Sequence, residues 1–547
     1  MRSTVTLGAA ALSILALTAP ATSALPLNAT GSDAASDPSS ADYGLLFARR
    51  DAPLSDCLSA AQAASTNSNG HRFGISTPSS SNYAALSTSY NPLFHYKPSY
   101  VLTPTSGKDV KAVMQCLAAQ KGRVKLTPKG GGHSYAAFSL GGDDGSVVVD
   151  LRHLDTIAVD AAAKTATVGA GVRLGTLAQT IWDQGRFALP HGTCPMVGVA
   201  GHSLGGGFGY ATRAWGYLMD RIESLRVVLP SGSIVTASPS ENQDLFWALR
   251  GGGSNNFGVV TAFTFRLESA PSQVINYSYN FKTNDDCARA LVALQKWTED
   301  ADAATGMPKE LGGELLVSGQ NGGDFDGNAC QLSGQHLDAT PESHRAVMQR
   351  FLDQVPAPAS SRVQPFGWLD SLTDIMGSLA VTPPAKDHEQ FYAKSLVTPP
   401  SAQFTHDQAL ELIRQLDGIA GLEGSGNSIS FDFLGPLSYP ATTGSQQPSS
   451  FNAHGAMFVS QFYSYDFPAS NDGGQQDRVH SAFDSLVATM QRVDPSAKWG
   501  AYVNYVDARL PGWAQMYYGD ALDRLKSLKA RYDPDTVLDF PQGLAHA

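Results

Sequence analysis

The sequence predicts an α+β protein of two domains, and three observations lead to this prediction. At 547 residues the chain is longer than one hydrophobic core usually organises, so two domains are expected. From Tyr100 onward short β-like runs alternate with helical segments, and three glycine clusters lie beside β runs. Near Leu267 the composition changes, because the glycine clusters stop and longer amphipathic segments follow. We therefore expect domains over 53–268 and 269–498, with a closing segment over 499–547.

The N-terminus has the pattern of a secretory signal over residues 1–24. Arg2 supplies the positive charge, Leu7 to Leu17 the short apolar core, and Ala24 a small residue at the cleavage site. Residues 25–52 are rich in Ala, Ser, Asp and Pro without periodicity, which predicts a disordered leader. No later segment reaches about 18 uninterrupted apolar residues. The sequence therefore predicts a secreted protein with no membrane partner.

Composition and charge narrow the class of partner. Hydrophobic residues make up 42% of the chain, which also contains 53 glycines, as in a globular, loop-rich protein. The net charge is −11 and no basic cluster is present, which argues against nucleic acid as a partner. N-x-S/T sequons at Asn28 and Asn276 are compatible with glycosylation.

The chain has five cysteines, so at least one thiol stays outside any set of disulfides. Cys57 and Cys116 lie in helical N-terminal segments, whereas Cys287 and Cys330 come much later. Four cysteines allow three pairings, and the sequence does not choose among them. Cys194 is then left over, and an unpaired thiol in an oxidising compartment indicates that something occupies it.

Periodicity and turn residues predict the elements in chain order. Pro230 to Ser233 is expected to be the turn of a hairpin spanning 223–238, and Asp533-Pro534 to stop the last helix. We expect helices over 111–120, 174–185, 244–250, 287–301, 406–416 and 521–532, and strands over 123–128, 147–151, 165–172, 314–319, 428–435 and 456–465, with another strand ending at Leu267.

Asp432 lies in the middle of an apolar strand, between Phe431 and Phe433. Because successive side chains of a strand point to opposite faces, its carboxylate faces away from both aromatic rings. The strands of the second domain are expected to turn such alternating residues toward a cavity. The alternative is an ordinary solvent-facing position.

The three glycine clusters lie in 128–135 (PKGGGHSY), 191–209 (HGTCPMVGVAGHSLGGGFG) and 251–253. Glycine lets the backbone approach a ligand closely, and successive N–H groups can form a concavity for a pyrophosphate. The alternative is a set of turns that link strands. None of the three clusters has the strand, G-x-G-x-x-G and helix of a dinucleotide fingerprint, so a nicotinamide site is not expected. No G-x-x-x-x-G-K-[ST] phosphate loop occurs either, so an ATP site is not expected.

Five motifs in a fixed order carry a family resemblance: GGGHSY, HGTCPMVGVAGHSLGGGFG, DLFWALRGGG with NFGVVTAFTF, YVNY and the closing DP…FPQ. From Cys57 to Gln542 the chain resembles FAD-linked oxidases of the vanillyl-alcohol-oxidase superfamily, in the berberine-bridge-enzyme-like group. Within that group it is most similar to fungal glucooligosaccharide and chitooligosaccharide oxidases. The resemblance implies a PCMH-type FAD-binding domain of two α/β subdomains over 53–268. It also implies a substrate domain with an antiparallel sheet over 269–498, and a segment, 499–547, that returns to complete the FAD domain.

The resemblance implies a bicovalent FAD and no metal. His133 would bond to the 8α methyl group of the isoalloxazine and Cys194 to ring carbon 6, which accounts for the odd cysteine. The small Val197 matches a position associated with oxygen access. Further FAD contacts are implied for Gly130, Gly131, Gly132, Ser134, Tyr135, Gly192, Thr193, Val197, Gly198, Gly201, His202, Gly205, Gly206, Gly207, Gly209, Val259, Tyr502 and Asn504.

The resemblance also implies the mechanism. Tyr505 matches the catalytic base and Asp432 the carboxylate that assists it, because a phenol with a pKa near 10 is a poor base unaided. Tyr505 would take the proton of a substrate hydroxyl while the hydride passes to the flavin. Oxidation of an anomeric hydroxyl would give a lactone, and O2 would be reduced to H2O2. Substrate contacts are implied for Tyr135, Thr193, Glu314, Gln461 and Tyr502.

Two positions depart from the glucooligosaccharide oxidase pattern. The strand of Asp432 reads NSISFDF, where that type has tryptophans and a glutamine. Glu314 has leucine partners where that type carries charged residues. An oxidase of the same fold acting on a secondary metabolite, by alcohol oxidation or oxidative cyclisation, is therefore the alternative function. A third hypothesis is a non-catalytic module that only binds glycans. The presence of His133, Cys194 and Tyr505, which the resemblance implies for flavin attachment and catalysis, argues against it.

Overall fold

The computed structural model describes residues 53–65, 72–302, 304–322, 325–381, 388–435 and 448–547. They belong to one compact unit, 49–547. The predicted signal, the predicted leader and the sequon at Asn28 lie outside the described residues, and the two domain boundaries stay a prediction. Within the described ranges, no helix combines the length and the apolar character that crossing a bilayer requires.

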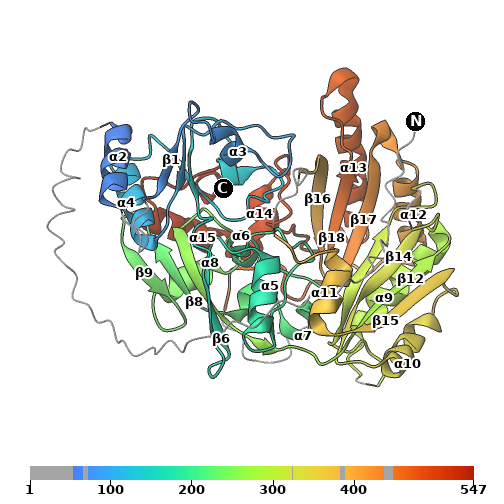
Figure 1. The fold of residues 1–547 in the computed structure, drawn as a ribbon. Helices are drawn as coiled ribbons and strands as arrows, with labels where there is room; N and C mark the ends of the chain where they lie inside the picture. The colour runs from blue at the N-terminus through green and yellow to red at the C-terminus, as the bar shows by residue number, and fades with distance from the viewer. Residues whose placement is uncertain (1–52, 66–71, 303, 323–324, 382–387, 436–447) are drawn as a thin grey trace, which may run out of the picture. The chain divides into compact units, whose positions relative to one another are not determined.

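The N-terminal half is built on two sheets (Figure 1). The first has the order β1-β2-β4-β3, in which β2–β4 and β3–β4 are parallel and β1–β2 is antiparallel. The second has the order β5-β6-β10-β8-β9 and is antiparallel throughout. The strands are β1 Gly74–Ser76, β2 Tyr100–Thr103, β3 Leu126–Lys129, β4 Val147–Asp150, β5 Ile157–Asp160, β6 Thr165–Gly169, β8 Ile222–Val228, β9 Ile234–Ala237 and β10 Val259–Arg266, with β7 Phe187–Ala188 paired to β11 Glu268–Ser269.

Residues 274–465 form a seven-stranded antiparallel sheet with the order β15-β12-β14-β13-β17-β18-β16. One face is apolar: Ile275, Leu315, Phe431 and Phe462 pack with buried side chains of covering helices in one core cluster. The opposite face carries Ser, Asn, Gln, Glu and Asp side chains at the alternate positions. The strands are β12 Val274–Phe281, β13 Leu311–Val317, β14 Cys330–Leu337, β15 Ser360–Phe366, β16 Phe391–Thr398, β17 Gly426–Phe433 and β18 Phe458–Tyr465.

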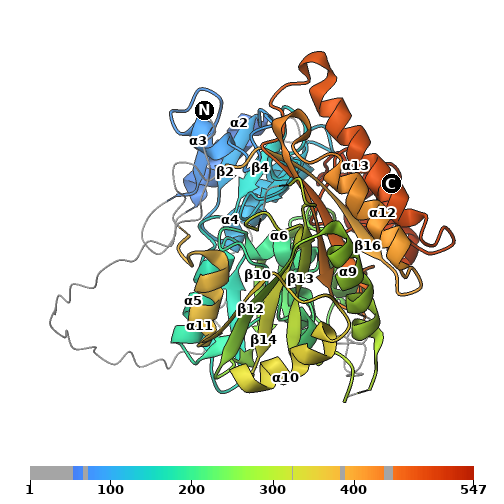
Figure 2. The same cartoon turned by 90° about the vertical axis from the view of Figure 1, so that its right-hand side faces the viewer.

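Most helices over the apolar face begin at side-chain caps. Thr283, Thr340 and Thr405 each accept a hydrogen bond from the backbone three residues on, which stabilises the first turn of a helix. Figure 2 shows α9, α10, α12 and α13 gathered about this sheet. The helices are α2 Leu54–Ala64, α3 Tyr83–Ser87, α4 Gly107–Ala118, α5 Leu174–Asp183, α6 Val199–Leu204, α7 Thr212–Trp215, α8 Gln243–Leu249, α9 Asn284–Glu299, α10 Pro341–Leu352, α11 Trp368–Met376, α12 His406–Asp417, α13 Gln475–Gln491, α14 Trp513–Tyr518 and α15 Leu522–Tyr532. The predicted α+β class is confirmed.

The cysteine pairing that the sequence left open is Cys57–Cys116 and Cys287–Cys330. The first bond joins α2 to α4, and the second joins α9 to the first residue of β14. Cys194 takes part in neither.

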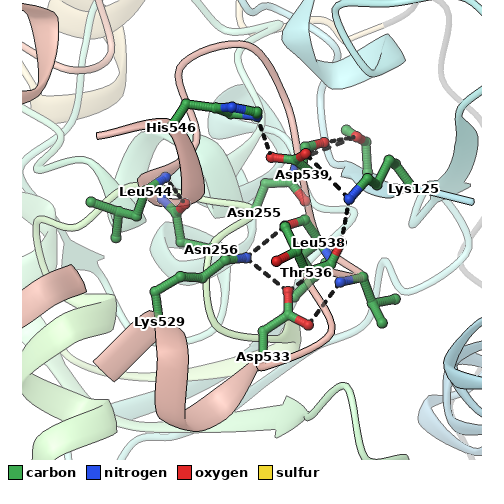
Figure 3. A network of polar contacts seen from close by, with 12 residues as sticks. Lys125, Asn255, Asn256, Lys529, Asp533, Thr536, Leu538, Asp539, Leu544 and His546 are labelled. Carbon is green, nitrogen blue, oxygen red and sulfur yellow. Dashed lines mark hydrogen bonds and ion pairs between the residues drawn. The ribbon is translucent and has the colours of Figure 1, made fainter. Parts of the chain in front are cut away.

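The C-terminal segment returns to the N-terminal half, and the red helix α15 lies beside α8 (Figure 1). After this helix Leu538 makes a parallel bridge with Leu126. Buried Lys529 donates to the carboxylate of Asp533 at 2.7 Å and to the carbonyl of Leu538 at 2.6 Å. Asn256, next to the third glycine cluster, accepts from the backbone N–H of Leu544 at 3.0 Å (Figure 3). These contacts hold the chain on either side of the third glycine cluster in place.

Two expectations from the sequence need correction. The strand expected over 165–172 ends at Gly169, because Gly171 turns to donate to the carbonyl of Leu154. The sequon at Asn276 does not fit glycosylation, since the residue is only 3% exposed. Its Nδ2 donates to the carbonyl of Ser371 at 3.0 Å and to the carboxylate of Asp374 at 2.9 Å, so a glycan would displace buried hydrogen bonds.

Candidate active site

All three glycine clusters contribute to the lining of one cavity of about 420 Å³. The first contributes Gly130 to Tyr135, the second contributes residues between Gly192 and Leu204, and the third contributes Gly253. The C-terminal residues 502–506 close the cavity from another side. The three glycine clusters therefore meet at one cavity, where a single ligand would contact all of them.

Gly131 and Gly198 bring the first two clusters into direct backbone contact. A Cβ on Gly131 would lie 2.3 Å from the backbone nitrogen of Gly198, and a Cβ on Gly198 would lie 2.2 Å from that of Gly131. Real Cβ atoms do not approach backbone this closely, so both positions require glycine. The close packing fixes the loops that carry His133 and Cys194 relative to each other.

We expect Gly131→Ala to lower the free energy of unfolding by about 3 kcal/mol, because the clashing atoms belong to backbone and cannot rotate away. Chemical denaturation followed by circular dichroism measures this. Gly107→Ala is the matched control, since its Cβ would meet nothing nearer than the Thr261 hydroxyl at 3.7 Å and alanine favours the helix it begins. Equal stability of the two variants would contradict the backbone clash.

The imidazole of His133 is half-buried and stacks against another ring. The Tyr90 ring stacks on it with centroids 4.1 Å apart at 23°. Burial, helped by the charges of Arg173 and His388, lowers the pKa of His133 to about 3. The imidazole is therefore neutral at neutral pH, which leaves one ring nitrogen with a lone pair available for bonding.

Two buried polar atoms in the cavity lining have no hydrogen-bond partner within the described part of the chain, namely Ser139 Oγ and Asn255 Oδ1. A buried polar group without a partner is costly. Asn255 also holds a left-handed backbone conformation with φ of 71°. The cavity therefore presents polar atoms suited to a polar ligand such as FAD, and the residues present fit that cofactor.

Seven residues implied as cofactor or active-site contacts do not line this cavity: Gly205, Gly206, Gly207, Gly209, Val259, Glu314 and Asp432. Val259 lies between lining residues Gly258 and Val260, because alternate positions of a strand face opposite ways. The glycines instead give room to neighbours. Gly207 donates its N–H to the Tyr502 hydroxyl at 2.9 Å, and a Cβ on Gly205 would lie 2.1 Å from the Asn504 side chain.

The ring of Tyr505 is enclosed by three others. Tyr135 stacks on it at 5.5 Å and 9°, Tyr502 meets it edge-on at 5.0 Å and 89°, and Phe208 lies 5.8 Å away at 72°. Burial raises the pKa of Tyr505 well above its usual value, and the nearby charge of Asp432 raises it further. Tyr505 is therefore a protonated phenol at rest, held in one orientation at the cavity wall.

Asp432 is only 8% exposed, so the solvent-facing interpretation of this strand position is wrong. It is the direct cross-strand partner of Glu314 in the pairing of β17 with β13. Burial raises the pKa of Asp432 well above its usual value, and the charge of Glu314 adds to the rise. Glu314 accepts a hydrogen bond from the Tyr210 hydroxyl at 2.6 Å.

The other implied substrate contacts, Tyr135, Thr193, Gln461 and Tyr502, line the cavity. Gln461 donates to the Tyr135 hydroxyl at 2.8 Å. Further residues that sequence reasoning missed also line this space, among them Tyr90, Phe208, Glu389 and Tyr463.

Two of these four residues had a local signal. Phe208 lies inside the glycine-rich motif 191–209, between Gly207 and Gly209. Tyr463 follows Gln461 by two residues on β18, so strand alternation would have found it. The Tyr90 hydroxyl donates to Glu389 at 3.0 Å across 299 positions of sequence, and no local pattern predicts that contact.

Comparison with protein families gives two matches. An FAD binding domain model matches residues 98–238, and a model for berberine and berberine-like proteins matches residues 501–545. The two stretches contain His133, Cys194 and Tyr505.

Individual proteins align over nearly the whole chain. A xylooligosaccharide oxidase from Thermothelomyces thermophilus is 34% identical over 86% of this chain and 92% of its own length. The structure of the xylooligosaccharide oxidase from Myceliophthora thermophila C1 in complex with xylobiose matches with a TM-score of 0.78 at 32% identity, covering 90% of this chain and 99% of that one. A glucooligosaccharide oxidase structure from Acremonium strictum, described with a 6-S-cysteinyl, 8α-N1-histidyl FAD, matches with a TM-score of 0.78 at 28% identity, covering 90% of this chain and 99% of that one.

Proposed function

Because this chain belongs to the berberine-bridge-enzyme-like family of FAD-dependent oxidoreductases, we propose that it oxidises the anomeric hydroxyl of an oligosaccharide to a lactone and passes the electrons to O2, giving H2O2. The observation that carries the proposal is the enclosure of Tyr505 by Tyr135 and Tyr502 at the wall of the cavity that also holds His133 and Cys194. A secreted location is part of the proposal, and the two disulfides support it.

FAD is proposed to be attached through His133 and Cys194. Three observations support this attachment. The neutral imidazole of His133 has a nucleophilic nitrogen, Cys194 takes part in neither disulfide, and both side chains line one cavity. The relative from Acremonium strictum is described with the same two kinds of bond. Once bound, FAD supplies the two-electron acceptor for the hydride that leaves the substrate carbon.

The chain's own residues move the proton. The Tyr505 phenol is protonated at rest, so it can accept the substrate's hydroxyl proton only as its own proton leaves. Asp432 is proposed as the acceptor, since the charge of its carboxylate acts on Tyr505 and raises the pKa of the phenol. This transfer requires Asp432 to be ionised before the reaction. The flanking rings of Tyr135 and Phe208 keep the phenol fixed in the meantime.

Substrate binding is proposed to involve the wall formed by Tyr135, Thr193, Gln461 and Tyr502. The Gln461–Tyr135 hydrogen bond orients a phenol and an amide side by side, which suits the hydroxyl groups of a sugar. Val197 lies in the same lining, and its small side chain is proposed to leave space for O2. The FAD-binding domain is proposed over 53–268 and the substrate domain over 269–498, with 499–547 completing the site.

Oxygen consumption with xylo-, cello- and chito-oligosaccharides tests the function. We expect H2O2 in amounts equal to the O2 consumed, together with an aldonic acid that mass spectrometry identifies after the lactone opens. A yellow holoenzyme that oxidises none of these sugars would refute the carbohydrate assignment. Screening small alcohols would then test the alternative, oxidation of a secondary metabolite. A colourless protein would refute the oxidase.

A further inference from the structure

Two acidic side chains, Glu314 and Asp432, lie side by side in the seven-stranded sheet. The proposed mechanism uses Asp432 and gives Glu314 no role. Glu314 of β13 and Asp432 of β17 are direct partners in an antiparallel pair, so their side chains project from the same face with Cβ atoms about 5 Å apart. Neither forms an ion pair with a lysine or arginine in the described ranges. Asp432 is buried and Glu314 is half-buried, so two negative charges at this distance repel.

The hydrogen bonds around the pair are not symmetrical. Glu314 accepts a short bond from the Tyr210 hydroxyl, 2.6 Å long, whereas Asp432 has a longer contact, 3.3 Å, from the Ser430 hydroxyl. A short bond from a phenol favours the ionised form of the acceptor. The negative charge of the pair is therefore better stabilised on Glu314.

The fold places Tyr210 in this position. A Cβ on Gly312 would lie 1.9 Å from the carbonyl oxygen of Tyr210, so glycine at position 312 lets the segment after α6 approach β13. Buried Arg213 of α7 donates to the carbonyl of Leu434, two residues after Asp432, and forms no ion pair with either carboxyl in the described ranges. The groups that interact electrostatically with Asp432 are Glu314, Tyr210, Tyr217, Tyr502 and Tyr505. Each of them is acidic or phenolic, and none brings a positive charge.

We propose that Glu314 and Asp432 hold one proton between them at neutral pH, with the charge kept on Glu314 by Tyr210, so that Glu314 is a positioning residue that sets the pH at which Asp432 can serve Tyr505. This proposal rests on the proposed function and replaces the role of Glu314 as a sugar contact. It fits the cavity, which Glu314 does not line. It also follows the direction of the pKa of Asp432, which the charge of Glu314 raises.

The sign of the expected pH effect follows from the charge. Asp432 must lose its proton before it can accept one from Tyr505, so activity falls on the acidic side of the pKa of Asp432. Removing the negative neighbour lowers this pKa. We expect the rate constant of anaerobic flavin reduction by substrate to fall at low pH in the wild type, and Glu314→Gln to shift this fall to lower pH by about one pH unit or more.

The matched control is Tyr277→Phe, which removes a hydrogen bond of 3.1 Å to the carbonyl of Gly312 from the opposite face of the sheet and changes no carboxyl charge. Its pH profile is expected to coincide with that of the wild type. A fall at low pH that stays in place in Glu314→Gln would show that burial alone holds the proton on Asp432, and it would overturn the proposal.

Infrared spectroscopy of the holoenzyme gives a readout that does not depend on turnover. At neutral pH we expect the wild type to show the C=O band of one protonated carboxylic acid that both Glu314→Gln and Asp432→Asn lose. A wild type without this band, or a variant that keeps it, would refute the shared proton. If the enzyme oxidises no sugar, so that the proposed function fails, the infrared result still decides the inference.

Discussion

Replacement of Tyr505 by phenylalanine is expected to slow the anaerobic reduction of the bound flavin by substrate by about 10²–10⁴-fold, the usual contribution of a general base. The rings of Tyr135, Tyr502 and Phe208 enclose a phenylalanine as well as a tyrosine, so the cavity keeps its shape. Only the hydroxyl that accepts the substrate's proton disappears. Stopped-flow spectroscopy at the flavin absorbance measures the rate directly.

Tyr532→Phe serves as the control for this variant. It also removes a phenol hydroxyl, one that donates to Asp244 at 2.8 Å, but it lies on the last helix outside the cavity lining. We expect wild-type reduction rates from it. Wild-type rates from Tyr505→Phe, with an unchanged visible spectrum, would remove Tyr505 from the mechanism.

The second large effect concerns the attachment of the cofactor. We expect Cys194→Ala and His133→Ala each to retain FAD through the remaining bond, and the double variant to release all of it on acid precipitation. The physical reason is that the two side chains are independent nucleophiles on two loops, which the contact between Gly131 and Gly198 holds together. Flavin absorbance in the pellet and the supernatant gives the covalent fraction.

The wild type and the disulfide variant Cys57→Ala/Cys116→Ala are the references for this experiment. Both are expected to keep the yellow colour in the pellet, because those cysteines lie in α2 and α4 outside the cavity lining. Release of free FAD from either single variant would show that the wild type holds FAD by only one covalent bond. A flavin-bearing peptide that contains Cys194, isolated from the wild type, would identify that bond.

The sequence by itself determined the family and the two residues proposed to attach FAD. His133 and Cys194 lie inside short contiguous motifs, GGGHSY and HGTCP. A motif of consecutive residues identifies them without any knowledge of long-range contacts. Helices such as α9 and α12 were also found, because their apolar period is local. The prediction missed the Thr283 cap, so it began α9 at Cys287 where the structure begins it at Asn284. The short helix α6 was not, since its six residues lie among glycines.

Only the tertiary structure decided which residues meet. The disulfide pairing, the Tyr90–Glu389 contact and the enclosure of Tyr505 join positions that are far apart in sequence. The pairing of Glu314 with Asp432 depends on strand register, and a slip of one residue would turn one carboxyl to the opposite face. Register is set by how all seven strands bury their apolar face together, and a single strand's sequence carries no record of which partner residue will lie opposite.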